Sequence, residues 1–310
     1  MTSEITLFVN PTAGRGRGAH AAQPAASALR AAGFSVRTVL GQDADDALRR
    51  AREAVEGGTG ALITVGGDGM VNLALQAVAG TTTPLGIVAA GTGNDFARAL
   101  GLPIRDPARA GELVARALKG GHGTDIDVGR IGERWFATVL ASGFDSKVND
   151  RGNRMRWPSG RFKYDLAMLA ELAAFTPIPY KITLDDGETR EVEATLVAVG
   201  NTSSYGGGMR ICADADPADG LFDVTVVGDC SRATLIKVFP RVYRGTHLGH
   251  PKVTTYRVAS ITLAAEGITG YADGERLGPL PLTAECVRGA VRVLAPLPAP
   301  GRKAVSPGLQ

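Results

Sequence analysis

The first 128 residues alternate between short apolar runs and longer segments of helical spacing, and this alternation constrains the fold more than any other feature. The apolar runs occupy 4–9, 34–39, 61–65 and 85–89, and the helical segments occupy 19–32, 43–56, 71–78 and 107–118. Strands separated by helices of this length pair in parallel through right-handed crossovers. We therefore predict an α/β domain with a mostly parallel sheet over 1–128, to which the tail 296–310 could return.

The pattern changes after about Asp127. Strand-like runs bounded by turn residues follow at 135–141, 180–184, 190–199, 222–227, 252–257, 260–264 and 291–294, with one helical stretch at 164–174. Short strands separated by turns predict a second, mainly antiparallel β domain over 129–295.

Composition narrows the class of protein. A chain of 310 residues with 44% hydrophobic and 21% charged residues is long enough for two globular domains. A net charge of +3 and 5% aromatic residues give no reason to expect a nucleic-acid partner. Three cysteines without a CxxC pair predict neither a disulfide framework nor a zinc site, and they fit a reducing cytoplasm. We expect no transmembrane segment and no secretory leader.

Two glycine-rich turns follow neighbouring strands of the predicted sheet. Gly66-Gly67-Asp68-Gly69 follows the run 61–65, and Gly91-Thr92-Gly93-Asn94-Asp95 follows the run 85–89. Glycines let the main chain approach a phosphate closely, with its N–H groups facing the ligand. Asp68 and Asp95 can converge on one crevice, where carboxylates beside phosphates favour Mg²⁺. Helix capping is the alternative role for Asn94 and Asp95.

A third strand-to-helix turn comprises Asn10-Pro11-Thr12-Ala13-Gly14 followed by Arg15-Gly16-Arg17-Gly18. Backbone N–H groups, a helix N-terminus and guanidinium groups together suit a polyphosphate. The turn matches neither the dinucleotide fingerprint nor the P-loop, so a basic turn without a ligand is the alternative.

Acidic side chains mark further turns beyond the first domain. Asp127 lies at the predicted domain junction, as a third metal-organising carboxylate or as a solvated linker acid. The segment 214–220, DADPADG, can wrap a hard cation with side-chain and carbonyl oxygens, or form an acidic turn. Asp273-Gly274-Glu275 lies on a tight turn, where a carboxylate can accept a proton from a substrate hydroxyl or simply form a hairpin tip.

Taken in order, seven motifs resemble those of the bacterial lipid kinase family related to diacylglycerol kinase: NPTAG, GGDG, GTGNDFAR, GFDSKVN, YGGGM, DADPADGLFDV and DGE. The resemblance runs from Asn10 to Glu275. Sphingosine and ceramide kinases share the catalytic domain, whereas NAD kinases and phosphofructokinases are more distant relatives that share the GGDG element. The resemblance implies a two-domain kinase that binds ATP between its domains and phosphorylates a lipid hydroxyl, with diacylglycerol as the expected substrate.

The resemblance also implies roles for individual residues. A catalytic Mg²⁺ would be organised through water by Asp68, Asp95 and Asp127, and a structural Mg²⁺ would be held by Asp219 with the carbonyls of Asp216 and Leu221. The DGE turn would supply the general base, with the choice between Asp273 and Glu275 open. The implied nucleotide contacts are Asn10, Pro11, Thr12, Ala13, Gly14, Gly66, Gly67, Asp68, Gly69, Met70, Val71, Asn72, Thr92 and Asn94.

The chain departs from the family pattern at three positions. Met70 stands where the family usually has Thr, and Leu73 stands where it usually has Glu. A hydroxyl and a carboxylate are thereby missing beside the predicted phosphates. Ala213 replaces a common proline in the second domain, which is a milder change.

A basic segment interleaved with aromatic residues precedes the predicted helix at 164–174. Such a segment suits an anionic membrane surface, and we expect peripheral attachment to the inner face of the membrane, in the cytoplasm. A solvated basic loop is the alternative. The expected membrane contacts are Arg154, Arg156, Trp157, Arg161 and Lys163. Exposed edge strands leave a homodimer open.

Two other functions are compatible with the sequence. A soluble-metabolite kinase of the NAD kinase type shares the GGDG turn, but it is not expected to carry GTGNDFAR together with the late DGE. A non-catalytic nucleotide-binding relative would explain Met70 and Leu73, but it has no need of a base such as Asp273.

Overall fold

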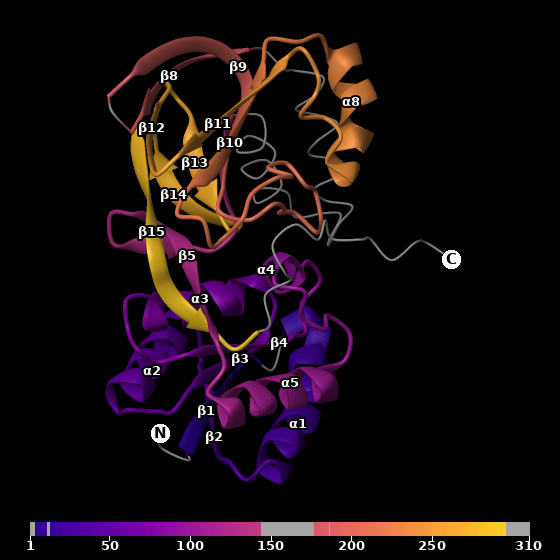
Figure 1. The fold of residues 1–310 in the computed structure, drawn as a ribbon, viewed down its shortest axis with the longest axis vertical. Helices are drawn as coiled ribbons and strands as arrows, with labels where there is room; N and C mark the ends of the chain where they lie inside the picture. The colour runs from indigo at the N-terminus through magenta and orange to yellow at the C-terminus, as the bar shows by residue number, and fades with distance from the viewer. Residues whose placement is uncertain (1–3, 11–12, 144–176, 186, 296–310) are drawn as a thin grey trace. The chain divides into compact units, whose positions relative to one another are not determined.

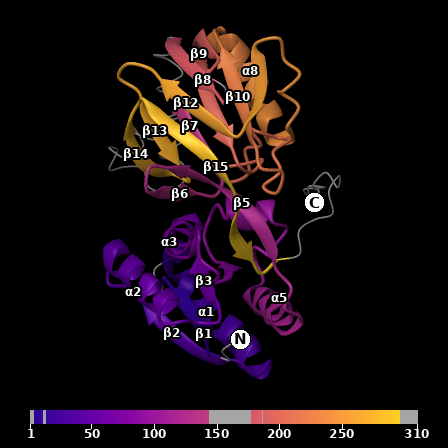
Figure 2. The ribbon, with the colours of Figure 1, turned by 60° about the vertical axis from the view of Figure 1, so that its left-hand side comes forward.

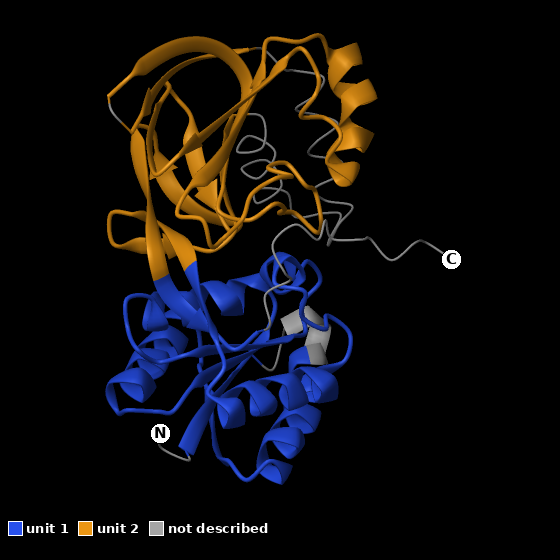
Figure 3. Ribbon diagram, in the orientation of Figure 1, with its two compact units in different colours: residues 1–126, 290–310 blue, residues 127–289 orange. Residues whose placement is uncertain are grey.

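The computed structural model describes residues 4–10, 13–143, 177–185 and 187–295, with the backbone alone over 13–17. The chain divides into two compact units (Figure 3). Unit 1 comprises Met1–Ile126 and Ala290–Gln310, and unit 2 comprises Asp127–Gly289. The predicted helix at 164–174 lies outside the described residues.

Unit 1 contains a parallel sheet, as predicted. Strand β1 (Glu4–Val9) pairs in parallel with β2 (Ser35–Leu40) on one side and β3 (Leu62–Gly66) on the other, and β3 pairs in parallel with β4 (Leu85–Ala89). The last residues of β15 (Leu282–Val293) lie beside β4, where Val293 is in register with Leu85. The prediction of a mostly parallel α/β domain is confirmed.

Helices cover both faces of this sheet (Figures 1 and 2). Helices α1 (Ala13–Ala31) and α5 (Pro107–Gly120) pack on one face, and α2 (Ala44–Glu56) and α3 (Asp68–Val78) pack on the other. A short helix α4 (Asp95–Ala99) follows β4. Apolar residues from the sheet and from both helices form the core under α1 and α5, among them Ile63, Val88, Leu29 and Val114.

Local signals explain most of these helix boundaries, and one boundary differs from the prediction. Asp43 and Asp106 cap α2 and α5 by accepting the backbone N–H groups three residues on, and Gly121 ends α5 in the left-handed region. Helix α1 begins at Ala13, six residues before the predicted start. Its first turns contain three glycines. Glycine has a low helix propensity, so the sequence pattern did not predict a helix there.

Unit 2 is built mainly of antiparallel strands, which confirms the second part of the predicted fold class. Its main path runs in the order β14-β13-β7-β9-β8-β12-β15, and β10 pairs with both β9 and β11. The bounds are β6 Arg134–Phe136, β7 Val139–Gly143, β8 Ile178–Leu184, β9 Thr189–Gly200, β10 Phe222–Gly228, β11 Val253–Val258, β12 Ser260–Ala264, β13 Thr269–Ala272 and β14 Glu275–Pro279. The rings of Phe136 and Phe222 stack in the core at 5.6 Å.

The structure adds elements that the sequence pattern did not predict. The predicted strand at 135–141 is two strands, β6 and β7, and the predicted strand at 291–294 is the end of the longer β15. Helix α8 (Arg232–Arg244) was missed because Pro240 interrupts its apolar spacing, and proline disfavours a helix interior. Strands β13 and β14 were missed because they are short and rich in glycine and charge.

The chain passes between the units twice, within β5 (Thr124–Ile131) and within β15. Each strand therefore contributes residues to both units. In the part of the chain that the structure describes, no helix has the length and apolar character that a membrane span requires.

Candidate active site

The two glycine turns of unit 1 lie against each other at the ends of β3 and β4. A Cβ atom added at Gly91 would lie 2.4 Å from the Cα of Gly67, and one added at Gly67 would lie 3.0 Å from the Cα of Gly91. Real Cβ atoms do not come within 2.4 Å of backbone, and at 3.0 Å the neighbouring backbone would have to shift. Glycine at both positions is therefore what allows the two turns to meet.

Asp68 fixes the second turn from the first. It lies in the first turn of α3, and its Oδ2 and Oδ1 accept the N–H groups of Asn94 and Asp95, each at 2.7 Å. Asn94 adopts a left-handed conformation with φ of 54°, and its side chain bonds both the N–H and the carbonyl of Gly91. One carboxylate therefore caps α4 and locks the turn before it.

The carboxylates of Asp68 and Asp95 face the same small space beside Gly93. A Cβ atom at Gly93 would lie 2.6 Å from the Oδ2 of Asp68 and 3.3 Å from the Oδ2 of Asp95. Asp95 is only 5% exposed. Two carboxylates with oxygen donors on one side of a glycine suit a hard cation bound through water, so the residues fit Mg²⁺.

Asp127, the first residue of unit 2, is buried and 4% exposed. Its Oδ2 accepts the N–H of Gly220 at 2.6 Å, and its Oδ1 accepts the N–H of Gly289 at 2.8 Å. Its backbone N–H donates to the carbonyl of Pro217. Asp127 thus links β5 to the DADPADG turn and to β15. Neither of its two predicted roles, a metal-organising carboxylate or a solvated linker acid, implied these bonds.

Two cations lie beside the acidic DADPADG turn, Arg257 and Arg288, and the guanidinium of Arg288 lies against Gly220. Asp219 forms an ion pair with Arg257, and the Nε of Arg257 lies 3.7 Å from the Oδ2 of Asp223. Burial raises the pKa of Asp223 to about 6, against the opposing effect of Arg257 and with a further rise from Asp219 and Asp214. The Oδ2 of Asp223 accepts no hydrogen bond from the described residues. The carboxylates of this turn, their negative charge and the Oδ2 of Asp223 together suit the binding of an additional cation.

Side chains of the described residues do not by themselves form a metal site. Among the described residues, no group of three or more His, Cys, Asp and Glu side chains is placed to hold a metal ion. The carbonyls of Asp216 and Leu221 would therefore have to complete the predicted structural site.

Asp273 occupies the tip between β13 and β14 and is held tightly. Its Oδ2 accepts the N–H of Ala137, and its Oδ1 accepts both the N–H and the hydroxyl of Thr138, at 2.8, 2.8 and 2.6 Å. Its backbone is left-handed, with φ of 53°. Glu275 is exposed two residues further on. The turn therefore presents one fixed carboxylate and one exposed carboxylate.

Comparison with known proteins identifies the family to which the chain belongs. The model of the diacylglycerol kinase catalytic domain matches residues 4–131, and that of the YegS C-terminal NAD kinase beta sandwich-like domain matches residues 138–295. A diacylglycerol kinase from Mycobacterium tuberculosis (strain CDC 1551 / Oshkosh) is 45% identical over 298 residues, which is 94% of this chain and 95% of the relative. The chain belongs to the diacylglycerol kinase family.

Other relatives extend the match within the diacylglycerol kinase family. A diacylglycerol kinase from Staphylococcus carnosus (strain TM300) is 27% identical and covers 96% of each chain. A crystal structure of a diacylglycerol kinase from Bacillus anthracis str. Sterne superposes with a TM-score of 0.72, at 25% identity, over 95% of this chain and 97% of that one. An ATP complex of an NAD kinase from Archaeoglobus fulgidus shares the fold alone, at 12% identity, with a TM-score of 0.54 over 95% and 93%.

Two of the three departures from the diacylglycerol kinase pattern, Met70 and Leu73, fall on α3. Met70 is buried, and its N–H donates to the carbonyl of Gly67, so its side chain joins the packing of the helix. Leu73 is half-buried. The chain has thus replaced a polar side chain by core packing at position 70.

Within the described residues, the remaining predicted nucleotide contacts lie at the carboxyl ends of the parallel strands β1, β3 and β4, or in the helices that follow β1 and β3. Asn10 follows β1, Thr92 is exposed, and Val71 and Asn72 lie in α3. Gly66 ends β3, Gly69 lies in the first turn of α3, and Ala13 and Gly14 open α1. Pro11, Thr12 and the expected membrane contacts Arg154, Arg156, Trp157, Arg161 and Lys163 lie outside the described residues.

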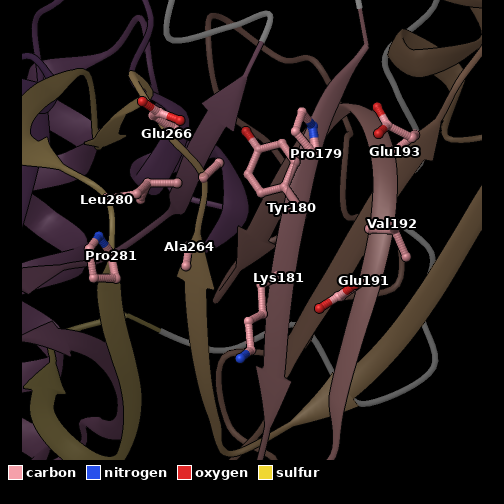
Figure 4. A pocket seen from close by; sticks show the side chains of 11 residues that line it. Pro179, Tyr180, Lys181, Glu191, Val192, Glu193, Ala264, Glu266, Leu280 and Pro281 are labelled. Atoms are coloured by element: carbon pink, nitrogen blue, oxygen red, sulfur yellow. The ribbon is translucent and has the colours of Figure 1, made fainter.

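Unit 2 also carries an open groove of about 600 Å³ that the predicted site residues do not line (Figure 4). It lies over β8, β9 and β12, where Lys181 faces Glu191 in register across the two strands. The groove is therefore separate from the DGE and DADPADG turns.

Proposed function

We propose that the protein is an ATP-dependent lipid kinase, which transfers the γ-phosphoryl group of ATP to the hydroxyl of diacylglycerol or a closely related lipid. Membership of the diacylglycerol kinase family makes it a kinase. The observation that carries the proposal is the double cap by Asp68, which joins two glycine turns and sets Asp95 beside them.

The nucleotide is proposed to bind at the glycine turns of unit 1. Backbone N–H groups at strand ends and helix N-termini stabilise phosphate charge without reorganisation during the reaction. The proposed contacts come from 10–14, 66–72, Thr92 and Asn94. Mg²⁺, when bound through water by Asp68, Asp95 and Asp127, would neutralise charge on the phosphates.

The DGE turn is proposed to take the proton from the attacking lipid hydroxyl. Phosphoryl transfer passes through a loose transition state and asks the protein chiefly for positioning and charge neutralisation, so one carboxylate suffices as base. Asp273 is fixed by Ala137 and Thr138, whereas Glu275 is exposed. Both carboxylates remain candidates for the base.

The basic and aromatic segment is proposed to hold the enzyme on the cytoplasmic face of the membrane. Its cations Arg154, Arg156, Arg161 and Lys163 each contribute up to about 1 kcal/mol on an anionic surface, and Trp157 adds apolar contact. A version with serine at the three arginines should lose sedimentation with anionic vesicles. Equal sedimentation would remove this part of the proposal.

Turnover with different acceptors tests the function. We expect ATP consumption with diacylglycerol in mixed micelles and none above background with NAD or without an acceptor. Mass spectrometry of lipid extracts incubated with labelled ATP identifies the lipid that gains phosphate. Consumption with NAD alone would favour a soluble-metabolite kinase, and no consumption with any acceptor would favour a non-catalytic nucleotide-binding protein.

A structural Mg²⁺ is proposed in unit 2, held by Asp219 with the carbonyls of Asp216 and Leu221. The buried oxygen of Asp223 and the surrounding negative charge support it. We expect Mg²⁺ to raise the Tm of the EDTA-treated, nucleotide-free protein by about 2 °C or more.

Two variants make this measurement specific. Asp219→Asn should abolish the rise in Tm. Asp229→Asn, at an exposed acid of the same unit, should keep it. A wild-type Tm that does not respond to Mg²⁺ would contradict the structural site.

A further inference from the structure

The side-chain amide of Asn201 joins two backbone segments of unit 2. Asn201 directly follows β9 and is 0% exposed. Its Nδ2 donates to the carbonyl of Asp127 at 2.8 Å and to the carbonyl of Ala137 at 3.0 Å. Both partners are carbonyl oxygens, which can only accept, so they fix the orientation of the amide. All three residues belong to unit 2, so the connection is a property of this unit by itself.

The two residues between β6 and β7, Ala137 and Thr138, form a link that is held from two sides. On one side, the N–H groups of both residues and the hydroxyl of Thr138 donate to the carboxylate of Asp273. On the other side, the carbonyl of Thr138 accepts the N–H groups of Asn201 and Thr202, at 2.8 and 3.1 Å. The Nδ2 of Asn201 adds the bond to the carbonyl of Ala137. The position of the DGE turn therefore depends on Asn201 through this link.

The oxygen of the same amide is not satisfied. Among the described residues, no donor bonds the Oδ1 of Asn201. A buried oxygen without a hydrogen bond costs free energy, and an apolar side chain of similar size would avoid this cost. The two bonds that the Nδ2 donates are therefore what an amide contributes at this position.

The backbone segments that Asn201 connects carry groups with different tasks in the proposed reaction. Asp127 would organise Mg²⁺ through water, and the DGE turn would take the proton from the lipid hydroxyl. Phosphoryl transfer depends chiefly on the placement of such groups, and a misplacement of about 1 Å can lower a rate by about 10²-fold. A side chain that fixes both segments can therefore affect turnover without contacting a substrate.

We propose that Asn201 is a positioning residue for phosphoryl transfer. Its amide holds the backbone of Asp127 and the link of Ala137 and Thr138 at a fixed separation, and the link passes this constraint to the DGE turn. The inference rests on the proposed kinase function. It is the same for either candidate base, because both carboxylates lie on the DGE turn.

Removal of the amide tests the proposal. Asn201→Ala should lower kcat by about 10²-fold and leave the KM values for ATP and diacylglycerol within about threefold, because it misplaces groups without removing a substrate contact. Thr225→Val is the matched control. The Thr225 hydroxyl is buried in the same unit and donates to the carbonyl of Ile211 at 2.9 Å. This control loses a buried bond of the same kind and should keep the wild-type kcat. An unchanged kcat in Asn201→Ala, or an equal loss in both variants, would overturn the proposal.

Two changes at Thr138 test the route through the link. Thr138→Val removes the hydroxyl that bonds Asp273, whereas Thr138→Ser keeps it, so only the first should lower kcat, by about tenfold. Thr138→Val combined with Asn201→Ala should lower kcat by less than the product of the two single losses, because both act through the same link. Losses that multiply in full would show that Asn201 does not act through the link.

Hydrogen exchange separates this inference from the proposed function. The N–H groups of Ala137 and Thr138, which bond Asp273, should exchange about tenfold faster or more in Asn201→Ala and at the wild-type rate in Thr225→Val. Faster exchange would support the positioning role even if the protein phosphorylated no diacylglycerol, a result that would contradict the proposed function alone. Unchanged exchange would refute the positioning role. If Asn201→Ala fails to fold by circular dichroism, Asn201→Ser, whose shorter side chain cannot bond both carbonyls, takes its place.

Discussion

Replacing Asp68 with asparagine is expected to lower kcat by about 10³-fold, because the change removes several kcal/mol of charge stabilisation from a metal-assisted phosphoryl transfer. The same change weakens the cap that holds the second glycine turn. An amide nitrogen in place of one carboxylate oxygen would face the N–H of Asn94 or of Asp95, which can only donate. Steady-state kinetics with saturating ATP and diacylglycerol measures the loss.

A matched variant distinguishes this effect from the ordinary loss of a helix cap. Asp43 caps α2 with its carboxylate in the same way, but it lies outside the two glycine turns. Asp43→Asn should leave kcat unchanged, because asparagine also caps helices well. An Asp68→Asn enzyme with kcat within tenfold of the wild type would refute the assignment of the site.

Changes in the DGE turn are expected to give the second large effect, a 10²- to 10⁴-fold loss of kcat in the variant that removes the general base. The two candidates differ in what else they should do. Asp273→Asn disturbs the bonds to Ala137 and Thr138, so it should also lower the free energy of unfolding by about 1–3 kcal/mol. Glu275→Gln, at an exposed position, should leave unfolding unchanged.

Kinetics and urea unfolding of both variants therefore identify the base. A loss of kcat without a loss of stability in Glu275→Gln assigns it to Glu275. Glu266→Gln, at an exposed position in the turn before β13, is the control and should behave as the wild type. Wild-type kcat in both Asp273→Asn and Glu275→Gln would exclude the turn as the source of the base.

The fold of unit 1 could be predicted because its signals are local. Apolar runs of strand length, helical spacing and capping residues such as Asp43 and Asp106 lie within a few positions of the elements that they define. The glycine motifs that contain Gly67 and Gly91 can also be recognised in the sequence. The structure explains them, because the two backbones approach so closely that a side chain would not fit. The crossover rules for parallel strands restrict the strand order but do not fix it, and the order β4-β3-β1-β2 is known only from the structure.

The partners of the site residues could not be predicted in the same way. The carboxylate of Asp127 bonds residues that lie 93 and 162 positions away, and that of Asp273 bonds residues 135 and 136 positions away. Apart from the hydroxyl of Thr138, these donors are backbone N–H groups, which every residue except proline carries, so the side-chain pattern does not indicate them. Helix α8 was missed for another reason, because Pro240 breaks the spacing from which a helix is predicted.

Unit 1 encloses unit 2 in the sequence, and this arrangement has a consequence during synthesis. Its sheet receives Val293 beside Leu85, and the carbonyl of Ala290 accepts the N–H of Gly80. The ribosome makes these residues after the whole of unit 2, so the sheet of unit 1 is completed only after unit 2 has been synthesised. Until residues 290–293 have been made, the edge of β4 that faces β15 stays open to pairing with other strands.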